Sequence, residues 1–147
     1  NLRSMDNSSS LRYTARFYSL LCCLAYWKLP QMMVWGGCRL IKLSLDDGIC
    51  LDSLFGFFLY SAAVCMQSKS SAVIKEACRV GKAVISLVNR PGFQSTLTVP
   101  RAYFVYYGLV AIWTESLQLC TTNLRKGFEG DETILICPFC LFLSVVS

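Results

Sequence analysis

The stretch PRAYFVYYGLVAIWTESLQLCTTNLRKGFEGD, residues Pro100–Asp131, predicts two helices packed against each other. Pro100 suits a first helical turn, and Tyr103–Trp113 is an unbroken apolar run of helical length. We therefore expect this first helix to be buried on most sides. Apolar residues then return at spacings of 3, 4 and 4 residues, at Leu117, Cys120, Leu124 and Phe128. This spacing is typical of an amphipathic helix, which we expect to cover the first.

Four more helices are predicted before this hairpin, and buried apolar helices alternate with amphipathic ones. The expected helices are Leu11–Trp27, Pro30–Asp47, Leu54–Met66 and Ser71–Arg90. Gly48 is suited to end the second helix, and Asp52 and Ser53 are both good N-caps for the third. The last segment, Asp131–Ser147, is also expected to be helical, with a kink at Pro138.

Helical spacing also predicts which face of each amphipathic helix is buried. In the helix that begins at Pro30, the predicted core stripe is Val34, Cys38, Ile41 and Leu45. In Ser71–Arg90, the predicted core stripe is Val73, Ala77, Val80, Val84 and Leu87, while Lys75, Arg79, Lys82 and Ser86 are expected to face solvent. We interpret the arginines and lysines between the stripes as solvated helix faces.

Short sequence matches indicate an internal repeat. Cys38-Arg39-Leu40-Ile41-Lys42 is followed 40 residues later by Cys78-Arg79-Val80-Gly81-Lys82, and Tyr60-Ser61 is followed 47 residues later by Tyr107-Gly108. Repeats of this period are typical of stacked helical hairpins. We therefore predict an all-α fold, a TPR-like stack of about three antiparallel hairpins over residues 11–147. Residues 1–10 are polar and serine-rich and are expected to be a linker or a frayed end.

Charge and composition disfavour several classes of function. The 147 residues carry 14 basic and 9 acidic side chains, and the basic ones are scattered rather than clustered, which argues against nucleic-acid binding. Histidine is absent, so Ser-His and Cys-His nucleophile pairs are excluded within this span. Because the sequence begins at Asn1 and ends inside an apolar run, we expect it to be a fragment of a longer protein.

The nine cysteines and the high apolar content indicate in which cellular compartment the protein is expected to lie. Most cysteines lie in apolar helical stripes, where cysteine behaves as a small hydrophobic residue, and this favours a reducing cytoplasm. Membrane insertion has to be weighed, since the mean hydropathy is +0.48. The longest uncharged spans are Phe17–Trp27, Ser53–Gln67, Ala102–Thr114 and Thr133–Ser147. Each is shorter than the ~20 residues that a bilayer crossing needs, so a polytopic membrane segment is the alternative and not the first choice.

Cys137-Pro138-Phe139-Cys140 is the one motif with a known chemical use. A C-x-x-C pair at a helix start can act as a redox pair, although no βαβ pattern surrounds this one, and structural cysteines are the preferred interpretation. A thiol redox protein is therefore a further alternative. Gly81-Lys82 does not belong to a phosphate loop, because the other required residues are missing. We predict no catalytic, cofactor-binding or metal-binding residues in this span.

The segment Cys78–Lys82, then Val99–Leu109 with its P-R-x-Y-x-x-x-Y-G stretch, followed by Ile112-Trp113, resembles the helical-repeat region of large multidomain signalling proteins. In that family a kinase-like module and an AAA-type (STAND) ATPase precede the region, and a GAF domain with a histidine kinase often follows. The resemblance spans about residues 35–140. It departs from the family pattern at Trp113–Leu117, which reads W-T-E-S-L where W-K-E-P-L is usual.

The resemblance implies a non-catalytic scaffold or sensor-relay segment that contacts other domains of the same chain or a protein partner. The residues expected to matter for the repeat are Arg39, Lys42, Arg79, Gly81, Lys82, Pro100, Arg101, Tyr103, Tyr107, Gly108 and Trp113. Gly108 costs helix stability in its apolar run, so we expect it to allow close packing against the helix that carries Cys120 and Leu124. Ser61 is expected to do the same one repeat earlier.

Overall fold

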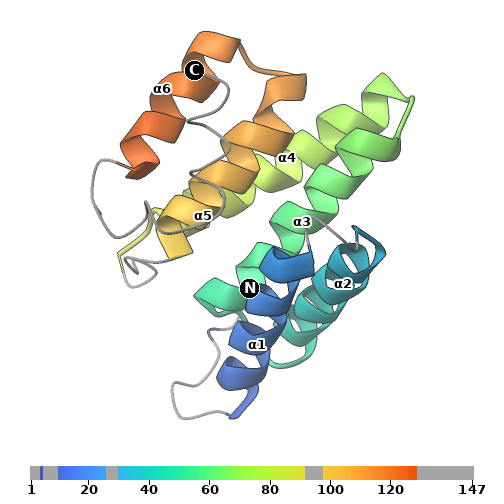
Figure 1. The fold of residues 1–147 in the computed structure, drawn as a ribbon, viewed down its shortest axis with the longest axis vertical. Coiled ribbons are helices and arrows are strands. Elements are labelled where there is room, and N and C mark those ends of the chain that lie inside the picture. The colour runs from blue at the N-terminus through green and yellow to red at the C-terminus, as the bar shows by residue number, and fades with distance from the viewer. Residues whose placement is uncertain (1–3, 5–9, 26–29, 92–97, 129–147) are drawn as a thin grey trace.

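The computed structural model describes residue 4 and residues 10–25, 30–91 and 98–128. Its elements are all helical, which confirms the all-α prediction (Figure 1). They are α1 (Ser10–Ala25), α2 (Pro30–Asp46), α3 (Leu51–Gln67), α4 (Ser71–Val88), α5 (Thr98–Val105), the π-helix η1 (Tyr106–Val110), the 3-10 helix η2 (Ala111–Trp113) and α6 (Leu117–Phe128). An isolated parallel bridge joins Ser4 to Ile49. The predicted helix over Asp131–Ser147 lies outside the described residues.

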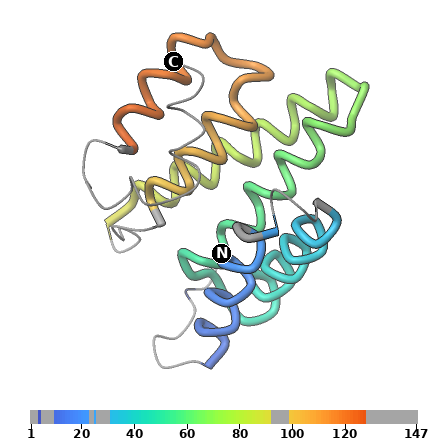
Figure 2. The backbone as a smooth tube through the Cα atoms, viewed as in Figure 1, coloured from blue at the N-terminus to red at the C-terminus, as the bar shows by residue number. Residues whose placement is uncertain are grey.

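Helix α3 occupies the middle of the molecule. It contacts α1 and α2 on one side, and α4, α5 and η1 on the other (Figure 2). Each helix from α1 to α4 also packs against the next one in the chain, and α6 packs on α5 and η1. None of the helices described above combines the length and the apolar character that a membrane crossing requires.

The helix boundaries follow local chemistry. Helix α2 begins at Pro30 as predicted, and Gly48, with φ of 104°, adopts the left-handed conformation that ends the segment. The start of α3 differs from the prediction. Cys50 is the N-cap, and Ser53 lies in the first turn, where its hydroxyl accepts from Cys50 N–H and donates to Cys50 C=O, both at 3.0 Å. Asp52 is likewise inside the helix, in the first turn, where the helix dipole stabilises a negative charge.

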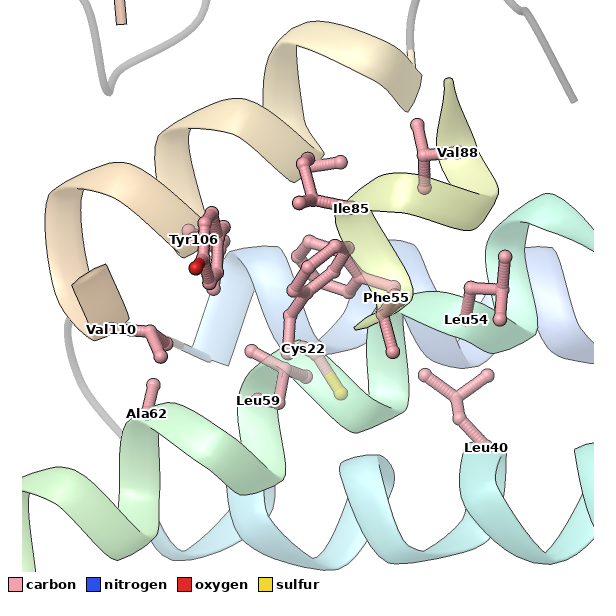
Figure 3. Close-up of a cluster of buried hydrophobic side chains, with 14 of the residues drawn as sticks. Cys22, Leu40, Leu54, Phe55, Leu59, Ala62, Ile85, Val88, Tyr106 and Val110 are labelled. Carbon is pink, nitrogen blue, oxygen red and sulfur yellow. The ribbon is translucent and has the colours of Figure 1, made fainter. Parts of the chain in front are cut away.

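The core joins buried side chains of α3 to those of α1, α2, α4, α5, η1, η2 and α6, and Figure 3 shows part of it. Cys22 comes from α1, Leu40 from α2, and Tyr106 with Val110 from η1. The largest fully buried side chain is Phe58, on α3. The core is therefore assembled mainly on the faces of one central helix.

Two predicted core faces are wrong. On α1, Tyr13, Phe17 and Leu20 are exposed, although the sequence predicts a buried helix here. On α2, the predicted stripe of Val34, Cys38, Ile41 and Leu45 is exposed or only partly buried. The buried face of α2 instead consists of Met33, Gly36, Gly37, Leu40 and Ser44. Three of these five residues, Gly36, Gly37 and Ser44, are small, whereas the predicted stripe consists mainly of large apolar residues.

The buried face of helix α4 agrees better with the prediction. Ala77 and Val84 are buried as expected, and the four polar residues predicted to face solvent are exposed. The remaining buried positions are Cys78, Gly81, Ile85 and Val88. Val73, which was predicted to face the core, is exposed.

The apolar run from Tyr103 to Trp113 is not one regular helix. The α-helix starts at Thr98, before Pro100, and ends at Val105, where the backbone widens into η1 and then tightens into η2. The backbone N–H groups of Thr114 and Glu115 both bond to the carbonyl of Ala111, at 3.0 and 2.8 Å, which closes the turn before α6. Helix α6 spans Leu117–Phe128, as predicted.

The expected close contact at Gly108 is absent. A Cβ placed on Gly108 would meet the Phe104 ring of the preceding turn at 3.9 Å, which is an ordinary contact. The close approaches occur at other glycines. A Cβ on Gly56 would lie 2.5 Å from Leu40 Cβ and 2.7 Å from the carbonyl oxygen of Gly37, so α2 and α3 touch through their backbones. Ser61 is fully buried, but its hydroxyl finds no hydrogen-bond partner within the described part of the chain.

Candidate functional site

Exposed aromatic and aliphatic side chains gather on α1 and α2. We name this the α1–α2 aromatic surface, and it consists of the exposed residues Tyr13, Phe17, Leu20 and Trp35 together with Tyr18, which is half-buried. Tyr13 is 76% exposed, Phe17 63% and Trp35 47%. Rings of this size are costly to leave in water, so a surface that carries several of them is a candidate binding site.

The rings of this surface are in mutual contact. Phe17 and Tyr18 pack edge to face with centroids 6.0 Å apart, and Tyr18 packs against Trp35 across the two helices at 5.6 Å. The guanidinium carbon of Arg39 lies 5.3 Å from the centre of the Trp35 ring, which is within the range of a cation–π contact. A row of aromatic rings therefore runs from α1 to α2 and ends under a positive charge.

Close helix packing explains why these large residues face outward. A Cβ on Gly36 would overlap the sulfur of Cys22 on α1, and a Cβ on Gly37 would lie 3.3 Å from Leu59 Cβ on α3. With only hydrogen atoms at these two positions, α2 fits tightly between α1 and α3. Little room remains for bulky side chains between the helices, so Trp35 projects to the outside.

The charges on the two helices are mostly positive. The described residues of α1 and α2 include Arg12, Arg16, Arg39 and Lys42 but only one acidic residue, Asp46, which pairs with Lys42 at 2.7 Å. Arg16 and Arg39 are exposed. The surface thus combines aromatic anchors with cationic groups, a combination enriched at protein–protein interfaces.

A second cluster is buried where α3 and α4 meet η1. The sulfurs of Cys65 and Cys78 lie 3.8 Å apart, and the Cys78 thiol donates to the carbonyl oxygen of Val110 at 3.4 Å. Gly81, one turn further along α4, faces the Tyr106 ring, which a Cβ would approach to 3.0 Å. The missing side chain at Gly81 thus makes room for the aromatic residue that begins η1.

Burial shifts the acid–base properties of this cluster. Burial, together with the neighbouring Cys78, raises the pKa of the Cys65 thiol to about 12. Burial also raises the pKa values of Tyr106, Tyr107 and Cys120, with a smaller contribution to each from Glu115. All four groups are therefore neutral near pH 7, and Cys65 is a poor nucleophile in the closed structure.

A smaller apolar patch lies at the other end of the molecule. It consists of Ile112, Trp113, Leu117 and Leu119, which are all exposed. The indole N–H of Trp113 donates to the carbonyl of Leu109 at 3.1 Å, so the ring is held against its own chain. The rings of the α1–α2 aromatic surface, in contrast, contact one another across two helices.

The residues singled out from the sequence do not form one site. Arg79 pairs with Glu76 through two hydrogen bonds of 2.6 and 2.8 Å, and Lys82 pairs with Glu115 at 3.3 Å. With Lys42, these are ion pairs on exposed helix faces. Arg39 differs, since it lies over Trp35.

The predicted residues of α5 and η1 have packing roles. The Tyr103 hydroxyl donates to Asn89 Oδ1 at 3.1 Å, and the Tyr103 ring packs against that of Tyr107 with centroids 5.5 Å apart. Pro100 is buried and Arg101 is half-buried. Sequence reasoning missed Tyr13, Phe17 and Trp35 as surface residues, and the available signal was the run of small residues on the opposite face of α2.

Comparison of this chain with protein-family models, with curated proteins and with solved structures finds no match. Cys137 and Cys140 lie outside the described residues. Within the described part, no group of three or more acidic or cysteine residues is placed to hold a metal ion.

Proposed function

We propose that this protein is a non-catalytic helical scaffold that binds a protein segment through the α1–α2 aromatic surface. The observation that carries the proposal is the continuous contact from Phe17 through Tyr18 to Trp35, capped by Arg39, on an exposed face. Rigid aromatic side chains contribute large contact areas at low entropic cost, and they are common among residues that dominate binding energy.

The side chains of the α1–α2 aromatic surface also indicate the composition of the partner segment. The positive charge of Arg39, which lies over the Trp35 ring, favours a partner with carboxylates. The exposed rings favour apolar anchors next to those carboxylates. An amphipathic segment with leucine or phenylalanine beside glutamate or aspartate fits both requirements.

We further propose that the chain belongs to a TPR-like stack in a cytoplasmic multidomain signalling protein, with the partner on the same chain or on another protein. Consecutive helices pack in sequence order, as stacked hairpins do. The two similar pentapeptides fall on α2 and α4, the second helices of successive pairs. The described cysteines are free, which suits a reducing compartment.

Site-specific photocrosslinking in cells that express this protein tests this function. A benzophenone amino acid replaces Phe17 or Trp35, and the matched control position is Ala83, which is exposed on α4. We expect both surface positions to crosslink to the same protein segment. Arg39→Glu should reduce this yield several-fold, because it reverses the charge above Trp35.

A stability control separates binding from folding. The variant Phe17→Ala should keep the free energy of unfolding within about 1 kcal/mol of the parent, since the Phe17 side chain is largely exposed. The proposal is wrong if positions 17 and 35 crosslink no more than position 83, or if they capture unrelated proteins that are indifferent to Arg39→Glu.

A further inference from the structure

Two buried cysteines face each other across the α3–α4 hairpin. Cys65 is in the last turns of α3, Cys78 is in the second turn of α4, and residues 68–70 connect the two helices. Both side chains are buried, and their sulfurs lie 3.8 Å apart without a covalent bond. A disulfide needs an S–S separation of about 2.05 Å, so the two sulfurs have to come closer before a bond can form.

Cys78 also connects α4 to the irregular segment that follows α5. Its S–H donates to the carbonyl oxygen of Val110, which lies at the junction of η1 and η2. Close by, Gly81 contacts Tyr106, and Lys82 pairs with Glu115. The Cys78 thiol therefore contacts both the Cys65 sulfur on α3 and the Val110 carbonyl at the end of the π-helical segment.

We propose that Cys65 and Cys78 form a disulfide when the cell is exposed to peroxide, and that this bond releases the η1–η2 segment from α4. The Cys78 sulfur, which is less deeply buried than that of Cys65, attacks hydrogen peroxide, which gives a sulfenic acid and one water. The second sulfur then displaces the sulfenic hydroxyl, which leaves as a second water. Two thiols and one peroxide thus yield one disulfide and two waters, and the peroxide is the species reduced.

The release follows from the loss of a hydrogen-bond donor. A disulfide sulfur carries no proton, so the Val110 carbonyl loses the Cys78 donor, and Cys78 is drawn toward α3. A polar group left without its partner in a buried position weakens the structure around it. This inference does not depend on the proposed binding function, because it uses neither α1 nor α2.

Peptide mapping of the full chain tests bond formation. The protein is treated with hydrogen peroxide under native conditions, free thiols are alkylated, and trypsin is added. Cleavage after Lys42, Lys69, Lys75 and Arg79 places Cys65 in residues 43–69 and Cys78 in residues 76–79. We expect these two peptides to be recovered linked, with two hydrogens lost and with Cys65, not Cys50, at the link. Recovery of both cysteines as alkylated thiols, or mainly linked elsewhere, overturns the proposal.

Hydrogen exchange of the amides in residues 106–114 tests the release. Oxidation should speed exchange about five- to tenfold in the parent, as expected when one buried hydrogen bond is lost. Cys65→Ser and Cys78→Ser cannot form the bond, and each keeps a donor at position 78, so peroxide should leave their exchange unchanged. Cys78→Ala should exchange fast before and after treatment. A linked protein whose exchange equals that of the reduced protein contradicts the release.

Discussion

The two sides of α3 are packed by different means. Toward α2, glycines at positions 37 and 56 bring the two backbones into direct contact. Toward η1, the contact is made by side chains, with the Tyr106 ring over Gly81 and the Cys78 thiol on the Val110 carbonyl. The first interface cannot widen without separating two helices, whereas the second can adjust by moving side chains.

This difference shows that the effect of a glycine on stability depends on which atoms lie opposite it. Gly56 faces backbone atoms of α2, Gly81 faces a ring, and Gly108 faces ordinary space near Phe104. Adding a methyl group at these three positions should therefore have three different effects, although glycine is costly in a helix at each of them. The following measurements test that ranking.

Gly56→Ala should have the largest effect. Its Cβ would lie 2.5 Å from Leu40 Cβ and 2.7 Å from the Gly37 carbonyl oxygen, and neither atom can move without moving α2. We expect the free energy of unfolding to fall by about 3 kcal/mol, at the upper end of overpacking costs. Denaturant titration measures this loss. Gly37→Ala, whose nearest contact is 3.3 Å, is the matched control and should cost less.

Alkaline pH should weaken the η1 side of α3. The unfolded chain releases the Cys65 proton above about pH 9, whereas the folded protein holds it up to a pKa of about 12. The unfolded state thus binds fewer protons in this window, so stability falls as pH rises, by up to about 1.4 kcal/mol per pH unit for this group. Chemical denaturation at several pH values gives the slope. Cys65→Ser should reduce the slope by that amount, and an unchanged slope would show that Cys65 titrates normally.

Gly81→Ala should cost about 1 kcal/mol, because the clash with Tyr106 and Val110 exceeds the gain in helix propensity. The Tyr106 ring is the nearest neighbour, at 3.0 Å from the added Cβ. In a Tyr106→Leu background the same change should become neutral or stabilising. Four denaturation curves complete this double-mutant cycle, and additivity of the two changes would contradict the ring contact.

Gly108→Ala should have the smallest effect and the opposite sign. Its Cβ would meet only the Phe104 ring, at 3.9 Å, so helix propensity decides the outcome. We expect stabilisation of about 0.5 kcal/mol, below the full propensity difference because the π turn is not a regular helix. The midpoint of thermal unfolding reports it. A destabilised variant would restore the close contact that the sequence first indicated.

The sequence predicted the helices better than their faces. Periodic apolar residues, Pro30 and Gly48 were sufficient to locate α2, because these signals are local. The buried face of α2 was not predictable in this way. Gly36, Gly37 and Ser44 are poor core residues on any hydrophobicity scale, and they are buried because α1 and α3 approach closely. Such an approach depends on the partner helix, which a single helical pattern does not contain.

The same limit applies to the candidate sites. Large apolar residues on α1 were assigned to the core, so Tyr13 and Phe17 were not recognised as a surface. Cys65 and Cys78 were each interpreted as small hydrophobic residues. This interpretation correctly predicts that they are buried, but it does not predict that they contact each other. Their contact depends on the register of α3 against α4 and not on their spacing of 13 residues. The π turn at Tyr106 leaves no recognisable mark in an otherwise continuous apolar run.

The central position of α3 also has a kinetic consequence. Helices α1 to α4 pack in chain order, so most contacts close short loops, and chains of this kind fold fast. Helix α3 is the exception, since it must form contacts with α1 and α5 as well as with its chain neighbours α2 and α4. The transition state for folding is therefore expected to contain α3 with its immediate neighbours. Substitutions such as Phe58→Leu should mainly slow folding, whereas changes in α6 should mainly accelerate unfolding.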